Sequence, residues 1–204
     1  MSKINQPSNL QEQVVSSVLL VEWLNKNLDG IEIKNDQQNI LAGSLYDITI
    51  EHFFGIVKLI ETKIYGPAFA LLRVQFESFV RGCWIKAHAN HEQLEKFIKK
   101  DKISQSFDDL ITAIESHPTF SNKNLSNLKN HSWTALNSYT HSGMLQLERR
   151  VKGNLFFPNY SDDEIIEVLK TSGTLALFAL QEISKIAHRT DLTQIVTEMI
   201  NKEQ

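Results

Sequence analysis

Three charged side chains recur at four-residue intervals within an otherwise apolar stretch of this sequence. Arg73, Glu77 and Arg81 lie in residues 66–90, where most neighbours are Leu, Val, Phe, Cys or Trp. Residues four apart lie on one face of an α-helix, so the spacing predicts a charged stripe along a single helix. Because the other faces are apolar, we expect this helix to run through the middle of a bundle. Charges there require partners, so the stripe either holds the packing together or belongs to a functional site.

A histidine later in the chain would complete such a site. His141 stands in the polar run Tyr-Thr-His-Ser-Gly of residues 139–143. An imidazole transfers protons near neutral pH and a guanidinium stabilises a charged transition state, the two functions that metal-independent cleavage of RNA requires. In this catalytic hypothesis His141 is the acid or base. Arg73 or Arg81 is then the electrostatic stabiliser, and Glu77 orients one of the two arginines.

The residues after His141 are basic, and the same hypothesis makes them RNA contacts. Arg149, Arg150 and Lys152 lie in a connection, residues 140–160, that we expect to be long and ordered. The chain has a net charge of −3 and therefore no overall attraction for phosphate, so RNA binding requires a local patch of this kind. The alternative is that Arg149 and Arg150 are ordinary surface charges.

The alternative to a catalytic site is a buried polar network in a non-catalytic interaction module. Arginine and glutamate four residues apart on a core helix often hold neighbouring helices in register, and a histidine can simply donate to a nearby oxygen. The two hypotheses differ in geometry. A site requires that His141 and at least one arginine open onto a shared cleft, whereas a network requires that the groups be enclosed and mutually satisfied.

The elements that must position these residues are helices. The apolar spacing predicts one all-α domain over residues 1–204, an antiparallel bundle of about five long helices plus short ones, with residues 1–8 flexible. We expect the second, third, sixth and seventh segments to dominate, and Asp47 and Glu51 to face Arg73 and Arg81 across the second and third. The predicted segments are 10–28 (capped by Ser8 or Asn9), 36–65, 66–90, 91–102, 106–116, 122–137, 161–187 (with a capping box at Ser161) and 191–200.

Metal and cofactor chemistry has little support in the sequence. His88, His91, Glu92 and Glu95 have spacings that share one helix face, as in bundle metal sites. Di-iron bundle sites require a Glu-x-x-His pattern on two helices and a Glu on two others. The sequence has no such set, since Glu51 is directly followed by His52, so we interpret this as a solvated face and expect no metal and no cofactor. Glycine-rich phosphate loops, cysteine metal knuckles and Ser-His-Asp arrangements are absent from the sequence.

Composition suggests where the protein resides and how it assembles. The N-terminus lacks a signal-peptide core and no uninterrupted apolar run reaches the ~18 residues of a membrane span, so we expect a cytoplasmic protein without membrane contact. Cys83 is the only cysteine, which excludes an internal disulfide, and we expect a buried, inert thiol. Trp23, Phe53, Phe54 and residues 155–157 exceed what one bundle face needs, so they predict either a homodimer interface or additional core.

Several short motifs carry a resemblance to known proteins. The pattern Arg73-Val-Gln-Phe-Glu77, then Arg81-Gly-x-Trp84, then residues 136–143 and 146–150, resembles a group of uncharacterised bacterial all-helical proteins. That group is itself similar to the HEPN superfamily, helical bundles of toxin–antitoxin, abortive-infection and phage-defence systems. The similarity covers most of residues 36–187. It implies a helical bundle acting in bacterial defence or stress response, with a protein partner from such a system and two subunits contributing to one site.

The resemblance departs from HEPN ribonucleases at one position. Those enzymes cut RNA without metal using an arginine, four to six intervening residues and a histidine. In this chain His141 fits the histidine, but the corresponding arginine positions hold Leu136, Ala135 and Thr134. Under the catalytic hypothesis Arg73 or Arg149 must therefore supply the missing charge in space. HEPN-like proteins without the motif are binding or antitoxin-like partners, which is the alternative implied here.

Overall fold

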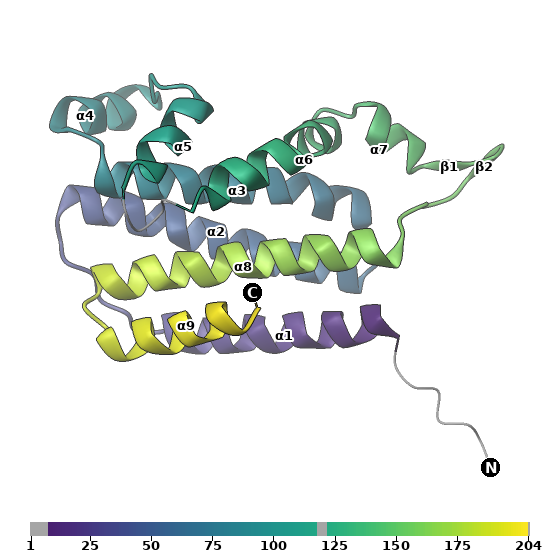
Figure 1. Ribbon diagram of the computed structural model, residues 1–204, viewed down its shortest axis with the longest axis horizontal. Helices are drawn as coiled ribbons and strands as arrows, with labels where there is room; N and C mark the ends of the chain where they lie inside the picture. Colours follow the sequence, from purple (N-terminus) through teal and green to yellow (C-terminus); the bar gives the residue numbers. More distant parts are fainter. Residues whose placement is uncertain (1–7, 118–121, 204) are drawn as a thin grey trace, which may run out of the picture.

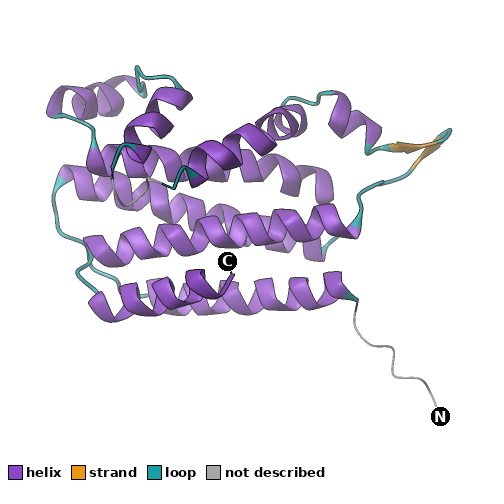
Figure 2. Ribbon diagram, in the orientation of Figure 1, coloured by secondary structure: helices purple, strands orange, loops and turns teal. Residues whose placement is uncertain are grey.

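Helices make up about three quarters of the described residues in the computed structural model, which describes residues 8–117 and 122–203. These residues form nine α-helices and one two-stranded hairpin, so the predicted all-α class is confirmed (Figure 2). The long helices are α1 (Asn9–Leu28), α2 (Gln37–Glu61), α3 (Tyr65–Ala87), α6 (Asn124–Thr140), α8 (Asp162–Ile186) and α9 (Thr190–Glu203). The short elements are α4 (His91–Lys100), α5 (Phe107–Glu115), α7 (Met144–Glu148), β1 (Val151–Lys152) and β2 (Leu155–Phe156).

The centre of the bundle is formed by α1, α2, α3 and α8. Helix α2 runs antiparallel to the other three and packs most extensively against α3 (Figure 1). Helix α9 lies against α8, and α6 lies across the outer side of α3, so α1 takes the central place that we expected for α6. The largest fully buried side chains come mainly from α2, α3 and α8, and include Tyr46, Phe53, Phe76, Phe79, Leu169 and Leu177.

Serine side chains set where several helices begin. Ser8, Ser106 and Ser161 each accept a hydrogen bond from the backbone three residues later, and each is part of a complete capping box. Such reciprocal bonds satisfy amide groups that would otherwise lack partners at a helix start. The capping box predicted at Ser161 is confirmed. Ser8, one of the two residues predicted to cap the first helix, is the N-cap of α1, and residues 1–7 lie outside the described chain.

The contact between α2 and α3 is close, and it sets which face of α3 points away from α2. A Cβ atom at Gly82 would lie 2.7 Å from Cε1 of Tyr46, closer than carbon atoms approach. Gly82 is therefore required for this approach. Arg73 and Glu77, on the opposite side of α3, face α6 instead.

The prediction that Asp47 and Glu51 pair with the α3 arginines is wrong. Both carboxylates line a hollow between α1 and α2 together with Asn25 and Lys26. Burial and the neighbouring Glu51 raise the pKa of Asp47, the opposite of what a paired arginine would cause. The close approach at Gly82 explains the difference, because it turns the charged stripe of α3 away from α2.

Buried hydrogen bonds join three of the four central helices, α2, α3 and α8. The side-chain amide of Gln75 on α3 donates to the backbone carbonyls of Thr49 at 3.1 Å and Ser172 at 3.0 Å. The Ser172 hydroxyl donates back to Gln75 Oε1 at 2.6 Å. All three residues are fully buried, so each polar atom needs these partners to avoid an unpaired group in the core.

Part of the connection between residues 140 and 160 is regular secondary structure. It contains α7 and a hairpin in which Val151 pairs with Phe156 and Lys152 with Leu155. Gly153, the first turn residue, has a φ of +62°, a conformation that favours glycine. Strands of two residues are too short to produce a readable alternation, which is why the sequence did not predict them.

One helix in the described chain is long and apolar enough to cross a membrane by composition alone. This helix is α2, whose mean hydropathy stays high although charged residues interrupt its apolar positions. Ten of its residues are buried, and α1, α3 and α8 pack around it. The central helix of a bundle has this composition because most of its faces contact other helices.

The apolar residues considered for an interface divide into two groups. Phe53 is fully buried, and Trp23 and Phe54 are half-buried against the same core. Residues 155–157, by contrast, are exposed on the hairpin and the turn that follows it. The first three therefore serve the core, and only the hairpin group remains available to a partner.

Candidate functional site

The charged stripe of α3 forms a continuous chain of ionic contacts. Arg73 Nε donates to Glu77 Oε1 at 2.9 Å, and Arg81 Nη2 lies 3.9 Å from Glu77 Oε2. The Arg73 and Glu77 side chains are 19% and 21% exposed, while Arg81 is 45% exposed. Arg73 and Glu77 therefore form a largely buried pair, and Arg81 extends from that pair to solvent.

A second stripe, on α6, faces the first. Lys129, Trp133, Asn137 and His141 also follow one another at four-residue intervals, so they share one face of α6 and its C-terminal cap. Asn137 Oδ1 accepts a short hydrogen bond from Arg73 Nη1. The Arg73 guanidinium lies over the Trp133 ring, 4.7 Å from its centroid, where a cation is favoured. Packing of α6 on α3 thus brings Trp133 and Asn137 to Arg73, although they lie sixty or more positions later in the sequence. We call the residues of the two facing stripes the group.

The donor and the acceptor in the contact between Arg73 and His141 can be assigned. Arg73 Nη1 lies 2.9 Å from His141 Nε2. A guanidinium can only donate, so Nε2 accepts and the imidazole proton resides on Nδ1. In this contact the acceptor nitrogen of the His141 ring is therefore directed at a cation. Its side chain is exposed at the end of α6, where the chain turns through Ser142 and Gly143.

Aromatic rings support the group from the side of α5. Phe107 stacks on Trp133 with ring centroids 4.7 Å apart, and Phe76 meets Phe107 edge-on at 5.4 Å. Lys129 completes this side, with its ammonium 5.8 Å from the Trp133 ring and 2.6 Å from Asp108. These contacts fix the position of Trp133 and, through it, the plane of the Arg73 guanidinium.

The group lies between the two geometries expected from the sequence. Arg73 and Glu77 are mostly enclosed and have partners, as a structural network requires. His141 and Arg81 reach solvent, which meets one condition of a site, the other being a cleft shared by the histidine and an arginine. Neither hypothesis is excluded by burial alone. The arrangement has a buried ion pair that holds an accessible imidazole.

The basic residues predicted to contact RNA lie elsewhere. Arg149 pairs with Glu164 at the start of α8 and contacts Tyr139, and hydrogen bonding to Tyr139 is the main cause that raises the Arg149 pKa. Arg150 is exposed, and Lys152 on β1 lies 5.9 Å from the Phe157 ring. No hydrogen bond or ion pair within residues 8–117 and 122–203 joins any of the three to Arg73, Glu77 or His141.

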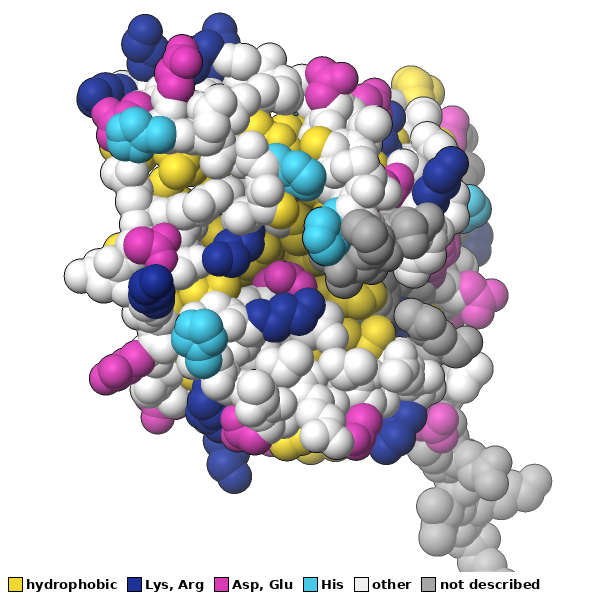
Figure 3. All heavy atoms as spheres, turned by 60° about the vertical axis from the view of Figure 1, so that its left-hand side comes forward, with side chains coloured by type: hydrophobic (Ala, Val, Ile, Leu, Met, Phe, Trp, Pro, Cys, Tyr) yellow, Lys and Arg dark blue, Asp and Glu magenta, His cyan; other side chains and the backbone are white. Residues whose placement is uncertain are grey.

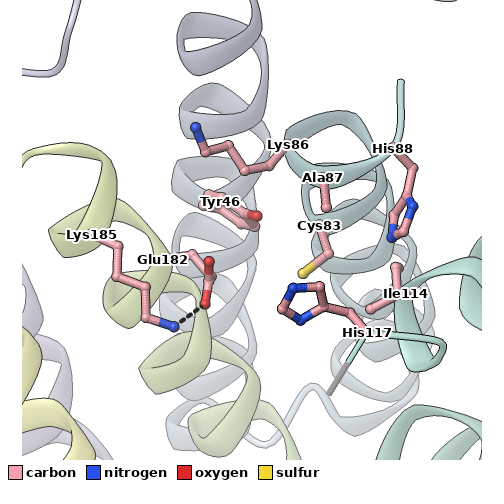
Figure 4. A pocket seen from close by; sticks show the side chains of 9 residues that line it. All are labelled: Tyr46, Cys83, Lys86, Ala87, His88, Ile114, His117, Glu182 and Lys185. Atoms are coloured by element: carbon pink, nitrogen blue, oxygen red, sulfur yellow. Dashed lines mark hydrogen bonds and ion pairs between the residues drawn. The ribbon is translucent and has the colours of Figure 1, made fainter. Parts of the chain in front are cut away.

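A separate cavity at one end of the bundle gathers other reactive side chains. Figure 3 views this end, where hydrophobic side chains are visible between basic, acidic and histidine side chains. The cavity has a volume of about 160 Å³, and its lining includes Tyr46, Cys83, His117 and Glu182 (Figure 4). Burial, reinforced by Glu182, raises the pKa of both the Cys83 thiol and the Tyr46 phenol. The thiol therefore stays protonated and is not a nucleophile, in agreement with the predicted buried cysteine.

The residues considered for metal binding do not form a metal site. Glu95 pairs with Lys99 at 2.5 Å, and the N-cap bond of Asn90 shapes the start of α4. Within the described ranges no group of three or more His, Cys, Asp or Glu side chains is arranged to hold a metal ion.

Sequence reasoning missed two members of the group, Asn137 and Trp133. Both residues lie in the predicted helix 122–137, with Asn137 as its last residue. The signal was present, because residues 129, 133, 137 and 141 repeat the four-residue interval of Arg73, Glu77 and Arg81. The predicted helix ended at 137, whereas α6 continues to Thr140, so the shared face was not recognised.

Comparison with known proteins places the chain in a family. No curated protein and no solved structure matches it. A family described as "Family of unknown function (DUF6988)" matches residues 46–202, which include α3, α6 and the whole contact group around Arg73. Because this match spans well over half of the chain, the protein belongs to this family of unknown function.

Proposed function

We propose that this protein cleaves RNA without a metal ion, with His141 as acid or base and Arg73 as electrostatic stabiliser. The observation that supports the proposal is the 2.9 Å contact between Arg73 Nη1 and the accessible His141 Nε2. Glu77 orients Arg73 through its 2.9 Å bond to Nε, the role expected of it from the sequence. Arg81, exposed beside Glu77, adds a second positive charge at the surface.

The proposed reaction uses groups that this arrangement already holds. The neutral Nε2 of His141 takes the proton of a ribose hydroxyl, whose oxygen attacks the neighbouring phosphorus. The bond from phosphorus to the next nucleotide breaks, its oxygen takes a proton from water, and a cyclic phosphate remains. Arg73 Nη1 exchanges its contact with His141 for a phosphate oxygen and offsets the negative charge that develops there.

The biological setting follows from the motif resemblance. The Arg-x-x-x-Glu helix and the later histidine suggest a HEPN-like protein of the bacterial cytoplasm, acting in phage defence or stress response. The missing arginine of the HEPN signature would be replaced by Arg73, which comes from a different helix and contacts the same histidine. A protein partner from a toxin–antitoxin system and a homodimer belong to the same proposal.

The second candidate is a non-catalytic interaction or antitoxin-like module. One observation favours it: Glu77, Asn137 and His141 already occupy the Arg73 guanidinium. An arginine with so many internal partners more often specifies packing than binds a ligand. In that case the group locks α6 onto α3, and the surface that functions lies elsewhere.

Incubation of the purified protein with labelled single-stranded RNA and tRNA in EDTA separates the two. The variants are His141→Ala and Arg73→Lys, and His91→Ala on α4 is the matched control because it removes an exposed histidine outside the group. Cleavage by wild type and His91→Ala, reduced at least ~100-fold in a folded His141→Ala, would support the ribonuclease. Absence of cleavage by wild type, or equal cleavage by His141→Ala, would exclude it.

A further inference from the structure

The most exposed apolar surface of the protein lies on one projecting segment. This segment, residues 144–157, comprises α7, the hairpin and Phe157, and we call it the arm. It extends from the bundle at the end opposite α4 (Figure 1). Leu155, Phe156 and Phe157 are 72%, 93% and 53% exposed, and Met144 and Leu147 are also exposed. Monomeric proteins rarely leave so many large apolar side chains together in water.

The arm is also incomplete as secondary structure. Its two strands have two residues each, and both of their outer edges lack a neighbouring strand in the part of the chain that the structure describes. A lone two-stranded hairpin is marginally stable in water, and open strand edges tend to pair with another chain. The arm therefore has the properties of an element that is completed by a partner.

A cavity that fits an apolar side chain lies at the base of the arm. It is enclosed by α3, α6, α7 and α8 and has a volume of about 230 Å³. Leu145 and Arg149 of the arm line one side of it. The remaining wall is mainly apolar, including Phe69, Leu72, Leu136 and Val168. A single aromatic or leucine side chain is of the size that such a space accommodates.

The charges of the arm and of the cavity rim are opposite. Arg150 and Lys152 are exposed on the arm, as is Glu148, so basic groups outnumber acidic ones there. Glu167, an exposed carboxylate of α8, lines the cavity, and its contact within the chain is a 4.0 Å approach to His131. A basic arm and an acidic rim on one surface are complementary between two copies of that surface.

We propose that the arm of one copy packs into the cavity of a second copy, and reciprocally, to form a two-fold symmetric dimer. In such a dimer a contact from residue i to residue j is repeated from j to i. Because the cavity lies at the base of the arm, two arms that cross side by side bring each hairpin to the cavity of the other copy. This proposal names the partner surface of the homodimer suggested above but does not depend on RNA cleavage.

The exposed area of the arm is close to what a specific dimer requires. Phe156 and Phe157 alone leave on the order of 300 Å² of aromatic surface per copy, since an aromatic side chain can bury about 150–250 Å². Two arms and the two cavity walls they cover then approach the roughly 1,000 Å² that a stable interface needs. An anionic membrane is the less favoured occupant, because the whole chain carries a net charge of −3.

Light scattering coupled to size exclusion tests the dimer, over roughly 1–100 µM protein. Wild type should be a dimer, and Phe156→Asp should dissociate it at least about 30-fold more readily, as for a central interface residue. Phe156 is nearly fully exposed, so this change leaves the fold intact. Val15→Asp on α1 is the matched control, because it places the same charge on another exposed apolar residue and should remain dimeric.

Crosslinking between two differently labelled variants tests the site itself. Leu155→Cys is mixed with Thr171→Cys, a residue lining the cavity, and treated with a short bismaleimide. A crosslinked heterodimer that fails to form when the first variant also carries Phe156→Asp would support the proposal. A monomeric wild type, a Phe156→Asp variant that stays dimeric, or arm-dependent binding of monomers to phosphatidylserine vesicles would each overturn it. RNA cleavage by the same samples is scored separately, so the two proposals can fail independently.

Discussion

Replacing Arg73 by alanine should destabilise the protein far more than replacing His141. Arg73→Ala removes the bond to Glu77, the bonds to Asn137 and His141, and the contact with Trp133. It also leaves Glu77, only 21% exposed, with Arg81 at 3.9 Å as its remaining cation. His141→Ala, by contrast, removes one contact made by an exposed side chain.

The sizes of the two effects differ enough to measure. Removing one partner of a fully buried ion pair costs ~3–5 kcal/mol, and partial solvent access reduces this to about 2–3 kcal/mol for Arg73→Ala. One hydrogen bond at an exposed histidine contributes about 1 kcal/mol or less. For a chain of this length each kcal/mol lowers the melting temperature by ~2–4 °C, so Arg73→Ala should melt about 5–10 °C below wild type.

Urea unfolding followed by circular dichroism, with thermal melts in parallel, provides the measurement. Arg73→Lys should lie between wild type and Arg73→Ala, because lysine retains the charge but not the fork of donors that reaches Glu77 and Asn137 together. A loss below about 1 kcal/mol for Arg73→Ala would refute the view that this arginine holds α6 on α3. Equal losses for His141→Ala and Arg73→Ala would refute the assignment of His141 to the accessible edge of the group.

Three further predictions concern the core. Gly82→Ala, which would stabilise an open helix by ~1 kcal/mol, should instead destabilise this protein by about 1–3 kcal/mol in urea unfolding, because the new Cβ meets Tyr46 at 2.7 Å; an equally or more stable variant would contradict the close contact. Gln75→Leu should cost about 2–3 kcal/mol by leaving the Ser172 hydroxyl without its acceptor, and the double variant with Ser172→Ala should recover part of that loss. Cys83 should react with iodoacetamide much more slowly in the native protein than in urea. Because burial raises the pKa of Cys83 in the folded protein, the contribution of the thiol to stability is complete below its ordinary pKa of 9.0 and is lost as the pH rises above that value. Unfolding curves from pH 8 to 10 would detect this loss in wild type and not in Cys83→Ala. An equally flat profile in both proteins would contradict it.

Local sequence patterns were sufficient for the elements of the fold. Apolar spacing and the serine caps at Ser8 and Ser161 indicated the long helices, because these signals act within one or two helical turns. The same reasoning placed Arg73, Glu77 and Arg81 on one stripe and Cys83 in the core. It also selected His141 as the histidine that would join them.

The partners of that stripe depended on packing between distant segments. Nothing in residues 36–65 reveals that the 2.7 Å approach at Gly82 turns Arg73 away from Asp47. That α6 is the neighbour of Arg73 depends on how Trp133 and Phe107 stack. The hairpin is equally hidden, because two-residue strands carry no period. A stripe of charge is a property of one helix and can be read from spacing. Which residues neutralise it is a property of contacts between segments up to sixty-eight residues apart, and these form only when the whole bundle packs.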